Sequence, residues 1–309
     1  MKTNERRFDV LTIDGIDVDL VITVPRLPGP DEKVMSKLIG TLSGGPAANF
    51  ACAASRLGLR VAALAELGDD PAGQLVIDDF IKYGVDTSLI HMRRDGKTSF
   101  TVILIPPGGE KAVVVVPTFA PEHSVEQLQA AFSQARLIYL MPLANFGMLA
   151  QLAHACGTEV MIDIEPLDGV DREMMRRIVA DSDIASFNQF GFRSAWGVAP
   201  SITAARQLLA LGPHTVVVTL GAQGALAVTR DEEVIQPGFA TEAVDTTGAG
   251  DTFNAAFMSA TLRGLPLAER LRFACAAGAL AVTGMGPRGR LPTVAEVNQF
   301  ADLGHADES

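Results

Sequence analysis

The spacing of hydrophobic positions switches repeatedly between two periods after Pro121. Segments with apolar residues three and four apart predict helices: SVEQLQAAF, ANFGMLAQLAHAC, DREMMRRIVA and SITAARQLLALG. Short apolar runs between and after them predict buried strands: LIYLM, EVMIDI, DIASF and TVVVTLG. Such alternation is typical of a mostly parallel sheet with helices on both faces, so the pattern predicts an α/β fold.

The first third of the chain adds further elements of both kinds. The predicted strands are FDVLTIDGI, VDLVITV and VAALAELG, and the predicted helices are AANFACAASRLG and the segment from Asp70-Pro71 to Gly84. After residue 250, DTFNAAFMSATLRG, LAERLRFACAAGALAVTG and TVAEVNQFADLG predict three more helices. The α/β core is therefore expected to use most of the chain.

Some strands do not fit the alternation. SFTVILI and KAVVVV flank Pro106-Pro107-Gly108-Gly109, which is a hairpin signal, and another strand follows Ile16. These runs predict a small β-sheet that projects from the core. We expect a single domain over residues 1–309, with lid strands at about 17–40 and 97–117 that cover the strand ends where open α/β sheets bind ligands.

Composition and charge narrow the function classes. The chain has 309 residues, 48% hydrophobic and 20% charged, which is a globular composition. A net charge of −11 argues against nucleic acid or an anionic membrane as the main partner, although local groups can still bind a phosphorylated ligand. Three cysteines without a Cys-x-x-Cys pair, and a charged N-terminus without a long apolar segment behind it, predict a cytoplasmic protein.

The stretch Asp245-Thr246-Thr247-Gly248-Ala249-Gly250-Asp251 carries the clearest chemistry. The two glycines leave room for a ligand, and consecutive backbone N–H groups at a helix start can converge on one anionic oxygen. Such a cradle suits a phosphoryl group in transfer. Asp251 would lie beside the reacting centre, and the helix N-terminus is expected to lower the pKa of its carboxyl group, leaving it an ionised, weak base.

A second glycine string points elsewhere. Residues 284–289 match G-x-G-x-x-G, which would suggest a dinucleotide-dependent oxidoreductase. The string contains a proline, follows a helix-like segment and has no βαβ unit after it, so this alternative fails on context.

Two motifs together resemble the ribokinase-like (PfkB) carbohydrate kinases. The stretch 245–253 resembles that family's C-terminal signature, and Gly44-Gly45-Pro46-Ala47-Ala48-Asn49 with the helix to Gly58 resembles its N-terminal one. The resemblance covers nearly the whole chain. It implies a three-layer α/β/α fold and transfer of the γ-phosphoryl group of ATP, with Mg²⁺, to a hydroxyl of a sugar. It also implies that Asp251 is the catalytic base and that Gly248, Ala249 and Gly250 form the anion hole.

The same resemblance implies the substrate contacts. Asp17 and Asp19 fall where the family grips sugar hydroxyls, and Gly44, Gly45 and Asn49 would touch the same substrate. Pro46 stands where ribokinase itself carries lysine, so ribose is not the expected acceptor.

The nucleotide side matches less fully. Thr219, Gly221 and Gly224 resemble the family's T-x-G-x-x-G turn beside ATP, and Asn188 matches the asparagine of its N-x-x-E motif. Gly191 stands where the family has the glutamate of this motif, and in the family that glutamate positions Mg²⁺ through water. Carboxylates at the end of EVMIDI, Asp163 and Glu165, are expected to compensate, because Mg²⁺ prefers oxygen ligands and keeps several waters.

A monovalent cation site is a further implication. Asp245 and Thr247 sit where many family members bind an activating K⁺, and Gly286 lies in the matching second loop. Arg288 and Arg290 are unusual there, and two explanations stay open: they reach a phosphate, or they occupy the cation site.

The expected function is therefore an ATP-dependent sugar kinase, with a homodimer through exposed edges of the lid. One alternative is a kinase of the same fold acting on a nucleoside, a sugar phosphate or a sugar acid. Another, motivated by Gly191, is a catalytically weak sugar- or nucleotide-binding sensor.

Overall fold

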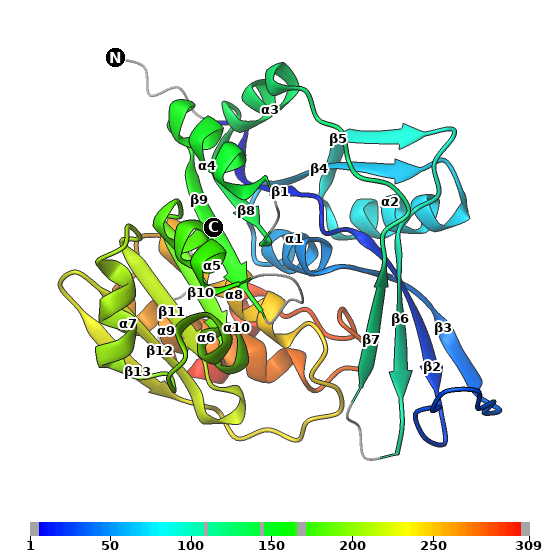
Figure 1. The fold of residues 1–309 in the computed structure, drawn as a ribbon. Coiled ribbons are helices and arrows are strands. Elements are labelled where there is room, and N and C mark those ends of the chain that lie inside the picture. The colour runs from blue at the N-terminus through cyan, green and yellow to red at the C-terminus, as the bar shows by residue number, and fades with distance from the viewer. Residues whose placement is uncertain (1–5, 108–110, 143–144, 166–170, 304–309) are drawn as a thin grey trace.

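The computed structural model describes residues 6–107, 111–142, 145–165 and 171–303, which form two separate sheets (Figure 1). Within these residues the larger sheet has nine strands in the order β13-β12-β11-β10-β9-β8-β1-β4-β5. They are β1 (Phe8–Ile13), β4 (Val61–Gly68), β5 (Asp86–Arg93), β8 (Ala135–Leu140), β9 (Glu159–Ile164), β10 (Ile184–Asn188), β11 (Thr215–Thr219), β12 (Gly224–Thr229) and β13 (Glu233–Pro237). Neighbours from β5 to β11 run parallel, and β12 and β13 pair antiparallel, so the prediction of a mostly parallel sheet is confirmed.

Helices cover both faces of the larger sheet, as predicted (Figure 1). One face packs against α1 (Pro46–Arg56), α2 (Pro71–Tyr83), α8 (Ala249–Leu262), α9 (Leu267–Ala281) and α10 (Val294–Ala301). The other packs against α3 (Val125–Phe132), α4 (Phe146–Ala155), α5 (Arg172–Ala180), α6 (Gln189–Trp196) and α7 (Ile202–Leu209). Successive strand residues point to opposite layers, so buried Val10 joins the first cluster and buried Leu11 the second.

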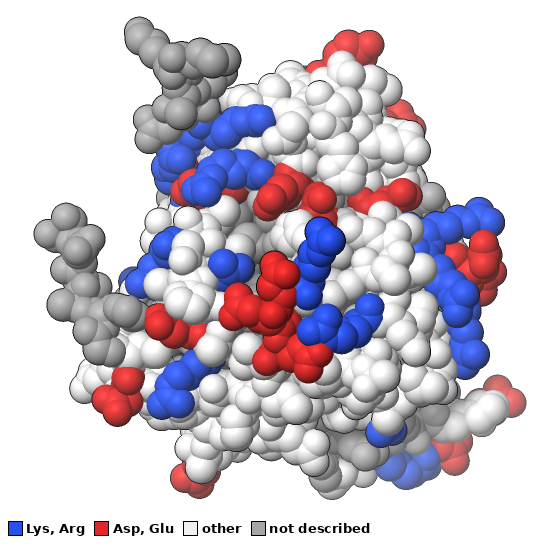
Figure 2. Space-filling view, turned by 90° about the vertical axis from the view of Figure 1, so that its left-hand side faces the viewer, with Lys and Arg blue, Asp and Glu red and all other residues white. Residues whose placement is uncertain are grey.

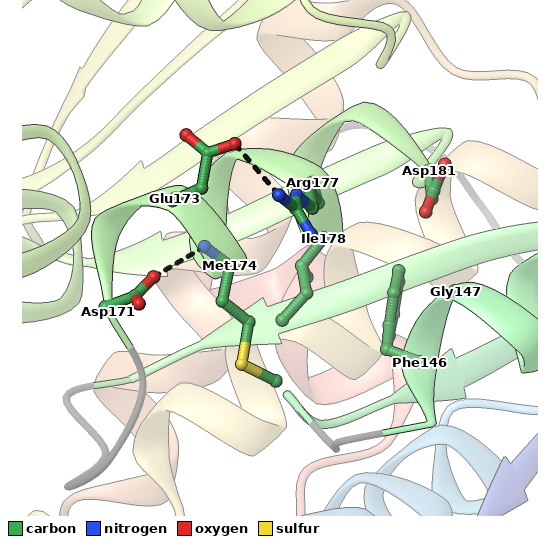
Figure 3. Close-up of a pocket in the computed structure, with 8 residues that line it drawn as sticks. All are labelled: Phe146, Gly147, Asp171, Glu173, Met174, Arg177, Ile178 and Asp181. Atoms are coloured by element: carbon green, nitrogen blue, oxygen red, sulfur yellow. Dashed lines mark hydrogen bonds and ion pairs between the residues drawn. The ribbon is translucent and has the colours of Figure 1, made fainter.

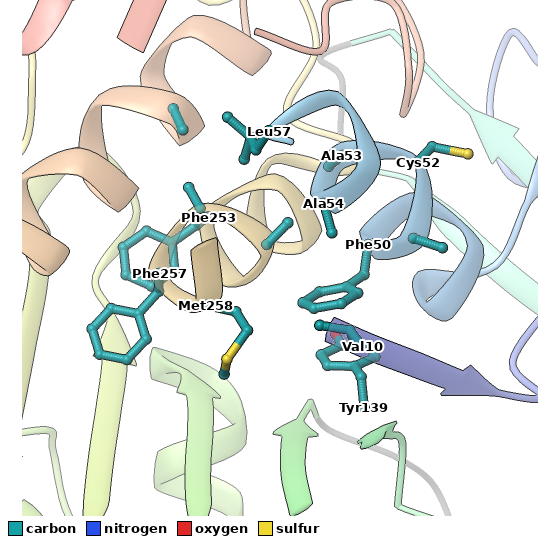
Figure 4. Close-up of a cluster of buried hydrophobic side chains, with 14 of the residues drawn as sticks. Val10, Phe50, Cys52, Ala53, Ala54, Leu57, Tyr139, Phe253, Phe257 and Met258 are labelled. Carbon is teal, nitrogen blue, oxygen red and sulfur yellow. The ribbon is translucent and has the colours of Figure 1, made fainter. Parts of the chain in front are cut away.

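The contact between α1 and α8 positions two predicted signatures. Both helices bury small and aromatic side chains against each other and the sheet (Figure 4). Phe50 of α1 stacks on Tyr139 of β8 with ring centroids 3.8 Å apart. Because tightly packed aromatic rings permit little rotation of the helix that carries them, Phe50 fixes the direction in which its neighbour Asn49 points.

The smaller sheet has four strands among the described residues, in the order β3-β2-β6-β7. They are β2 (Asp17–Thr23), β3 (Lys37–Gly44), β6 (Phe100–Ile105) and β7 (Ala112–Val116). The sheet projects from the core as predicted (Figure 1). The predicted turn at Gly108-Gly109 lies outside the described residues. Strand β3 continues to Gly44, past the predicted limit at residue 40, because this edge strand is mostly exposed and has no buried alternation to read.

Several elements escaped prediction. Strand β5 is partly buried with two exposed residues, helix α6 follows β10 without a loop, and the β12–β13 hairpin follows β11 after a short turn. Strand β5 shows no regular alternation of buried and exposed positions, and α6 begins at the residue after β10, which is why the hydrophobic pattern alone did not reveal them.

Charges of both signs intermix on the face shown in Figure 2, where Asp and Glu side chains gather beside Lys and Arg. That face therefore offers no wide basic area to a nucleic acid. No helix in the described part of the chain is long and apolar enough to cross a membrane.

Candidate active site

Asn49 and Asp251 meet although they are 202 positions apart in the chain. Asn49 lies in the first turn of α1 and Asp251 in the first turn of α8. The Asn49 Nδ2 donates to Asp251 Oδ2 at 2.9 Å. The structure thus brings together the two signatures that the sequence analysis singled out.

The glycine pair before α1 leaves room for a neighbouring carboxylate at Gly44 and a neighbouring backbone at Gly45. A Cβ at Gly44 would lie 2.4 Å from the Asp19 carboxylate, and a Cβ at Gly45 would lie 2.3 Å from the Gly15 carbonyl oxygen. Gly45 also has φ +89°, a conformation that favours glycine. The pair lets β2, β3 and the start of α1 converge at the site.

Asp17 and Asp19 point from β2 into this region as acceptors. The Thr101 hydroxyl donates to Asp17 Oδ2 at 2.7 Å, whereas Asp17 Oδ1 is buried without a hydrogen-bond partner. Asp19 is only 6% exposed. Burial raises the pKa of the Asp17 carboxyl group, and burial together with the Asp17 charge raises that of Asp19 to about 6. At least one carboxylate oxygen of this pair therefore has no hydrogen-bond donor in the protein, and the hydroxyl group of a bound molecule could supply it.

Asp19→Asn is expected to stabilise the protein at alkaline pH. The pKa of Asp19 rises from 3.8 to about 6 on folding. The folded state therefore costs nothing extra at low pH, where this carboxyl group is protonated, and loses stability as pH rises through about 6 and the buried group becomes charged. The variant removes that cost, on the order of 2 kcal/mol in free energy of unfolding at pH 8, and little at pH 4. Urea unfolding at both pH values measures this difference in stability, and Asp231→Asn at an exposed position is the control. An Asp19→Asn variant that is less stable than the parent at about pH 8 would contradict the prediction.

The pKa of Asp251 differs from the sequence-based expectation. Burial and the charges of Asp163 and Glu165 raise the pKa of its carboxyl group well above the ordinary value, against the opposing influence of Asn49 and Arg288. The prediction that the helix N-terminus lowers this pKa was wrong, since burial and the neighbouring carboxylates outweigh the helix terminus.

Asp163 and Glu165 differ in their surroundings. Asp163 is buried, and the Tyr139 hydroxyl donates to its Oδ2 at 2.9 Å; burial and the Glu165 charge raise its pKa. Glu165 is exposed and accepts a hydrogen bond of 3.1 Å from Asn188 Nδ2. No cluster of three or more acidic, His or Cys ligands occurs among the described residues. This donor set fits a Mg²⁺ that keeps waters, and it does not form an all-protein cage.

The 245–248 turn is tied to the loop before α10. Asp245 Oδ1 accepts from the Thr247 backbone N and hydroxyl at 2.9 and 2.8 Å, and Asp245 Oδ2 accepts from Gly286 N at 3.0 Å. Although burial opposes them, these hydrogen bonds lower the pKa of Asp245. Lys111 Nζ, beside β7, donates to Thr247 Oγ1 at 3.1 Å. The smaller sheet therefore reaches across to the turn.

Gly248 and Gly250 meet different surroundings. Gly248 caps α8 with φ +77°, and a Cβ there would lie 2.4 Å from the Pro287 carbonyl oxygen. A Cβ at Gly250 would meet nothing within 4 Å. Gly248 is thus needed by the fold, whereas the space beside Gly250 is open.

The four predicted nucleotide residues lie at one edge of the larger sheet. Asn188 and Thr219 are paired neighbours at the ends of β10 and β11, and Gly221 and Gly224 form the turn into β12. Two of them also have structural duties. Asn188 caps α6 by accepting from Gly191 N at 2.7 Å, and a Cβ at Gly224 would lie 2.0 Å from the Gln236 carbonyl oxygen.

Gly191 cannot carry a side chain in this backbone, because a Cβ would lie 2.2 Å from the Ile164 carbonyl oxygen at the end of β9. We expect Gly191→Ala to lower the free energy of unfolding by about 2 kcal/mol, since α6 must move off β9. Gly191→Glu, which restores the N-x-x-E motif, should be at least as costly and should not raise activity. Denaturant unfolding measures both, and Gly278→Ala is the control because its Cβ would meet only contacts of 3.5 Å or more. An unchanged midpoint for Gly191→Ala would contradict the expectation.

The Arg288 side chain turns away from Asp245 and Thr247 and pairs with other segments. Its Nη1 forms an ion pair with Asp79 and donates to Ser43 Oγ at 2.7 Å, and its Nε donates to Asn49 Oδ1 at 3.1 Å. Arg290 instead donates to Thr283 Oγ1 at 2.9 Å. The contact of Arg288 with Asn49 escaped the sequence analysis, because nothing local marks which of two neighbouring arginines turns inward.

A surface pocket of about 440 Å³ lies between α4 and α5 (Figure 3). Its lining includes Phe146, Met174 and Arg177, and Arg177 pairs with Glu173 at 3.2 Å within α5. None of the residues predicted from the sequence lines it, so we assign it no part in the reaction.

Comparison with known proteins agrees with the geometry. The profile described as pfkB family carbohydrate kinase matches residues 7–294. A ribokinase of Haemophilus influenzae is 31% identical over 307 residues, covering 96% of this chain and 99% of the relative. A deoxyribokinase of Salmonella typhi is 26% identical, covering 96% of this chain and 99% of the relative.

Solved structures share the fold. The Arabidopsis thaliana ribokinase complexed with ribose and ATP superposes with a TM-score of 0.85 at 24% identity, covering 96% of this chain and 99% of the other. A Thermotoga maritima ribokinase gives 0.82 at 25% identity with the same coverage. The chain therefore belongs to the pfkB family of carbohydrate kinases and is an ATP-dependent sugar kinase, a phosphotransferase with an alcohol group as acceptor.

Proposed function

We propose that this chain transfers the γ-phosphoryl group of ATP to a hydroxyl, on a hydroxymethyl group, of a neutral sugar. The hydrogen bond between Asn49 and Asp251 carries this proposal, because it places the predicted base beside the turn that would hold the sugar. The complex of Arabidopsis thaliana ribokinase with ribose and ATP, and a putative E. coli ribokinase with ATP and Mg²⁺, make ATP and Mg²⁺ the expected partners here.

A neutral acceptor follows from the charges around the site. Asp17 and Asp19 are buried acceptors, and Asp17 Oδ1 has no donor of its own. The buried Arg288 is close enough for its charge to lower the pKa of both carboxyl groups, but it is already paired with Asp79. Sugar hydroxyls satisfy such carboxylates by donating hydrogen bonds, whereas an acidic or phosphorylated sugar would meet like charge. The same argument weighs against the sugar-acid and sugar-phosphate alternatives.

The reaction would be an in-line displacement. The sugar hydroxyl oxygen forms a bond to the γ-phosphorus, the bond from that phosphorus to the bridging oxygen of ADP breaks, and Asp251 takes the hydroxyl proton. The raised pKa of Asp251 makes its carboxylate a stronger base. The N–H groups of residues 248–250 would stabilise the transferring charge. Mg²⁺, held through water by Asp163 and Glu165 beside Asn188, would neutralise phosphate charge.

Asp17, Asp19, Gly44, Gly45 and Asn49 are the proposed sugar contacts, and Asn188, Thr219, Gly221 and Gly224 the proposed ATP contacts. The four-strand sheet is the proposed lid of a single domain, supported by the bond from Lys111 to Thr247. We also propose a K⁺ site beside Asp245 and Thr247, where three hydrogen bonds fix one carboxylate between two loops. Exchange of K⁺ for choline in the assay tests it, because an unchanged kcat would remove K⁺ from the mechanism.

A homodimer through the smaller sheet is a further part of the proposal. Its edge strands β3 and β7 expose apolar side chains: Leu38 (57%), Ile39 (53%), Val113 (49%), Val114 (53%) and Val115 (62%). Apolar edge strands tend to pair with a partner. Sedimentation velocity tests this, and a monomer at micromolar concentration would contradict it.

The function is tested by ADP release with Mg²⁺, ATP and a panel of neutral pentoses and hexoses, sugar acids, sugar phosphates and nucleosides. We expect the highest kcat/KM with a neutral sugar. Turnover confined to acids or phosphates would contradict the neutral acceptor, and binding without turnover of any compound would favour the sensor.

A further inference from the structure

Arg288 lies at the junction of four segments. It belongs to the loop between α9 and α10, yet its side chain is only 6% exposed. Its guanidinium reaches Asn49 on α1, Ser43 and Gly44 on β3, and Asp79 on α2. A buried arginine with partners on three other segments holds all of them in fixed relation.

The donors of Arg288 are almost fully used. The Nε donates to Asn49 Oδ1 at 3.1 Å, and Nη1 donates to both Ser43 Oγ and Asp79. Nη2 donates to the Gly44 carbonyl oxygen at 3.4 Å. Because the guanidinium is planar and its five N–H groups lie in fixed directions, these contacts determine where Nε points.

The chemistry of these groups determines the orientation of the Asn49 amide. An arginine only donates hydrogen bonds, so the amide must turn its oxygen toward Arg288 Nε. The amide nitrogen then faces Asp251 and donates to Oδ2 at 2.9 Å. The reversed amide would set two donors against each other at Arg288 and two acceptors against each other at Asp251.

We propose that Arg288 is a positioning residue for the transfer, acting on Asp251 through the amide of Asn49. This rests on the proposed role of Asp251 as base. Without Arg288 the amide can rotate, the carboxylate loses its fixed donor, and its second oxygen is no longer aimed at the sugar hydroxyl. Misplacement of a reacting group lowers the rate of the chemical step more than it lowers binding of the nucleotide.

The test is a double-mutant cycle in the full chain. Arg288→Met is expected to lower kcat about 30-fold and to change the KM for ATP less than about two-fold. Asn49→Ala lowers kcat by itself, and the double variant should be no slower than Asn49→Ala, because Arg288 acts only through Asn49. Arg288→Lys should recover part of kcat, since an ammonium can donate to Asn49 Oδ1 without the planar fork.

Two further variants separate positioning from loss of fold. Arg272→Met removes another part-buried arginine, one that donates to the Ala301 carbonyl oxygen at 2.7 Å, and should leave kcat within about two-fold. Arg288→Met with Asp79→Leu avoids an unpaired, partly buried carboxylate and should fold while remaining as slow as Arg288→Met.

A folded Arg288→Met variant, alone or with Asp79→Leu, that keeps full kcat would overturn the proposal. The proposal would also be overturned if the kcat of the double variant fell below that of Asn49→Ala by the same factor that Arg288→Met causes in the parent. The proposed function fails separately, by retained activity in Asp251→Asn, and so the two failures are distinguishable.

Discussion

Asp251→Asn is expected to lower kcat about a thousand-fold, while the KM values for ATP and sugar change by less than about five-fold. The amide cannot take the proton of the attacking hydroxyl, although it keeps the size and the neighbours of the carboxyl group. In the parent, Asn49 Nδ2 donates to Asp251 Oδ2 at 2.9 Å. In the variant the same Nδ2 would face either the oxygen or the nitrogen of the new side-chain amide. The effect should therefore lie in the chemical step.

Stability measurements distinguish this from unfolding. Burial and the charges of Asp163 and Glu165 already raise the pKa of Asp251, so removing its charge should stabilise the fold above neutral pH. Asp78→Asn, on the exposed side of α2, is the matched control and should keep kcat within about two-fold. An Asp251→Asn variant with more than a tenth of the parent kcat would exclude Asp251 as the base.

Gly248→Ala should abolish most activity and also weaken the fold. At φ +77° an alanine is strained, and its Cβ would lie 2.4 Å from the Pro287 carbonyl oxygen. The 245–250 turn must then separate from the loop that carries Gly286, breaking the contact of that loop with Asp245. We expect a loss of about 2–3 kcal/mol in free energy of unfolding and at least about a hundred-fold loss of kcat.

Gly250→Ala is the matched substitution in the same helix turn. A Cβ at this position meets nothing within 4 Å, and alanine is the better helix former, so the free energy of unfolding should not fall. Activity should still drop, because the added methyl would occupy space that the phosphoryl group needs. Thermal unfolding with steady-state kinetics measures both variants. Full activity of Gly250→Ala would show that the phosphoryl group does not pass beside residue 250.

Local chemistry let the sequence predict most helix boundaries. Asp70 caps α2 by accepting from Gly73 N at 2.8 Å, and Gly84 ends that helix in the left-handed conformation. Ser124 and Thr293 both begin predicted helices, and each does so with a capping box. These signals involve residues within four positions of each other, so they do not depend on the rest of the fold.

The sequence by itself thus determined the parallel core, the projecting sheet and the glycine turns that precede α1 and α8. Only the tertiary structure decided what depends on distant partners. The pKa of Asp251 is raised by burial and by the charges of Asp163 and Glu165, more than eighty positions away, and not lowered by its own helix. Gly191 is fixed by the carbonyl oxygen of Ile164, and Arg288 by an asparagine 239 positions earlier. Burial, electrostatic interaction and close packing arise from neighbours in space, and no pattern along the chain records which neighbours those are.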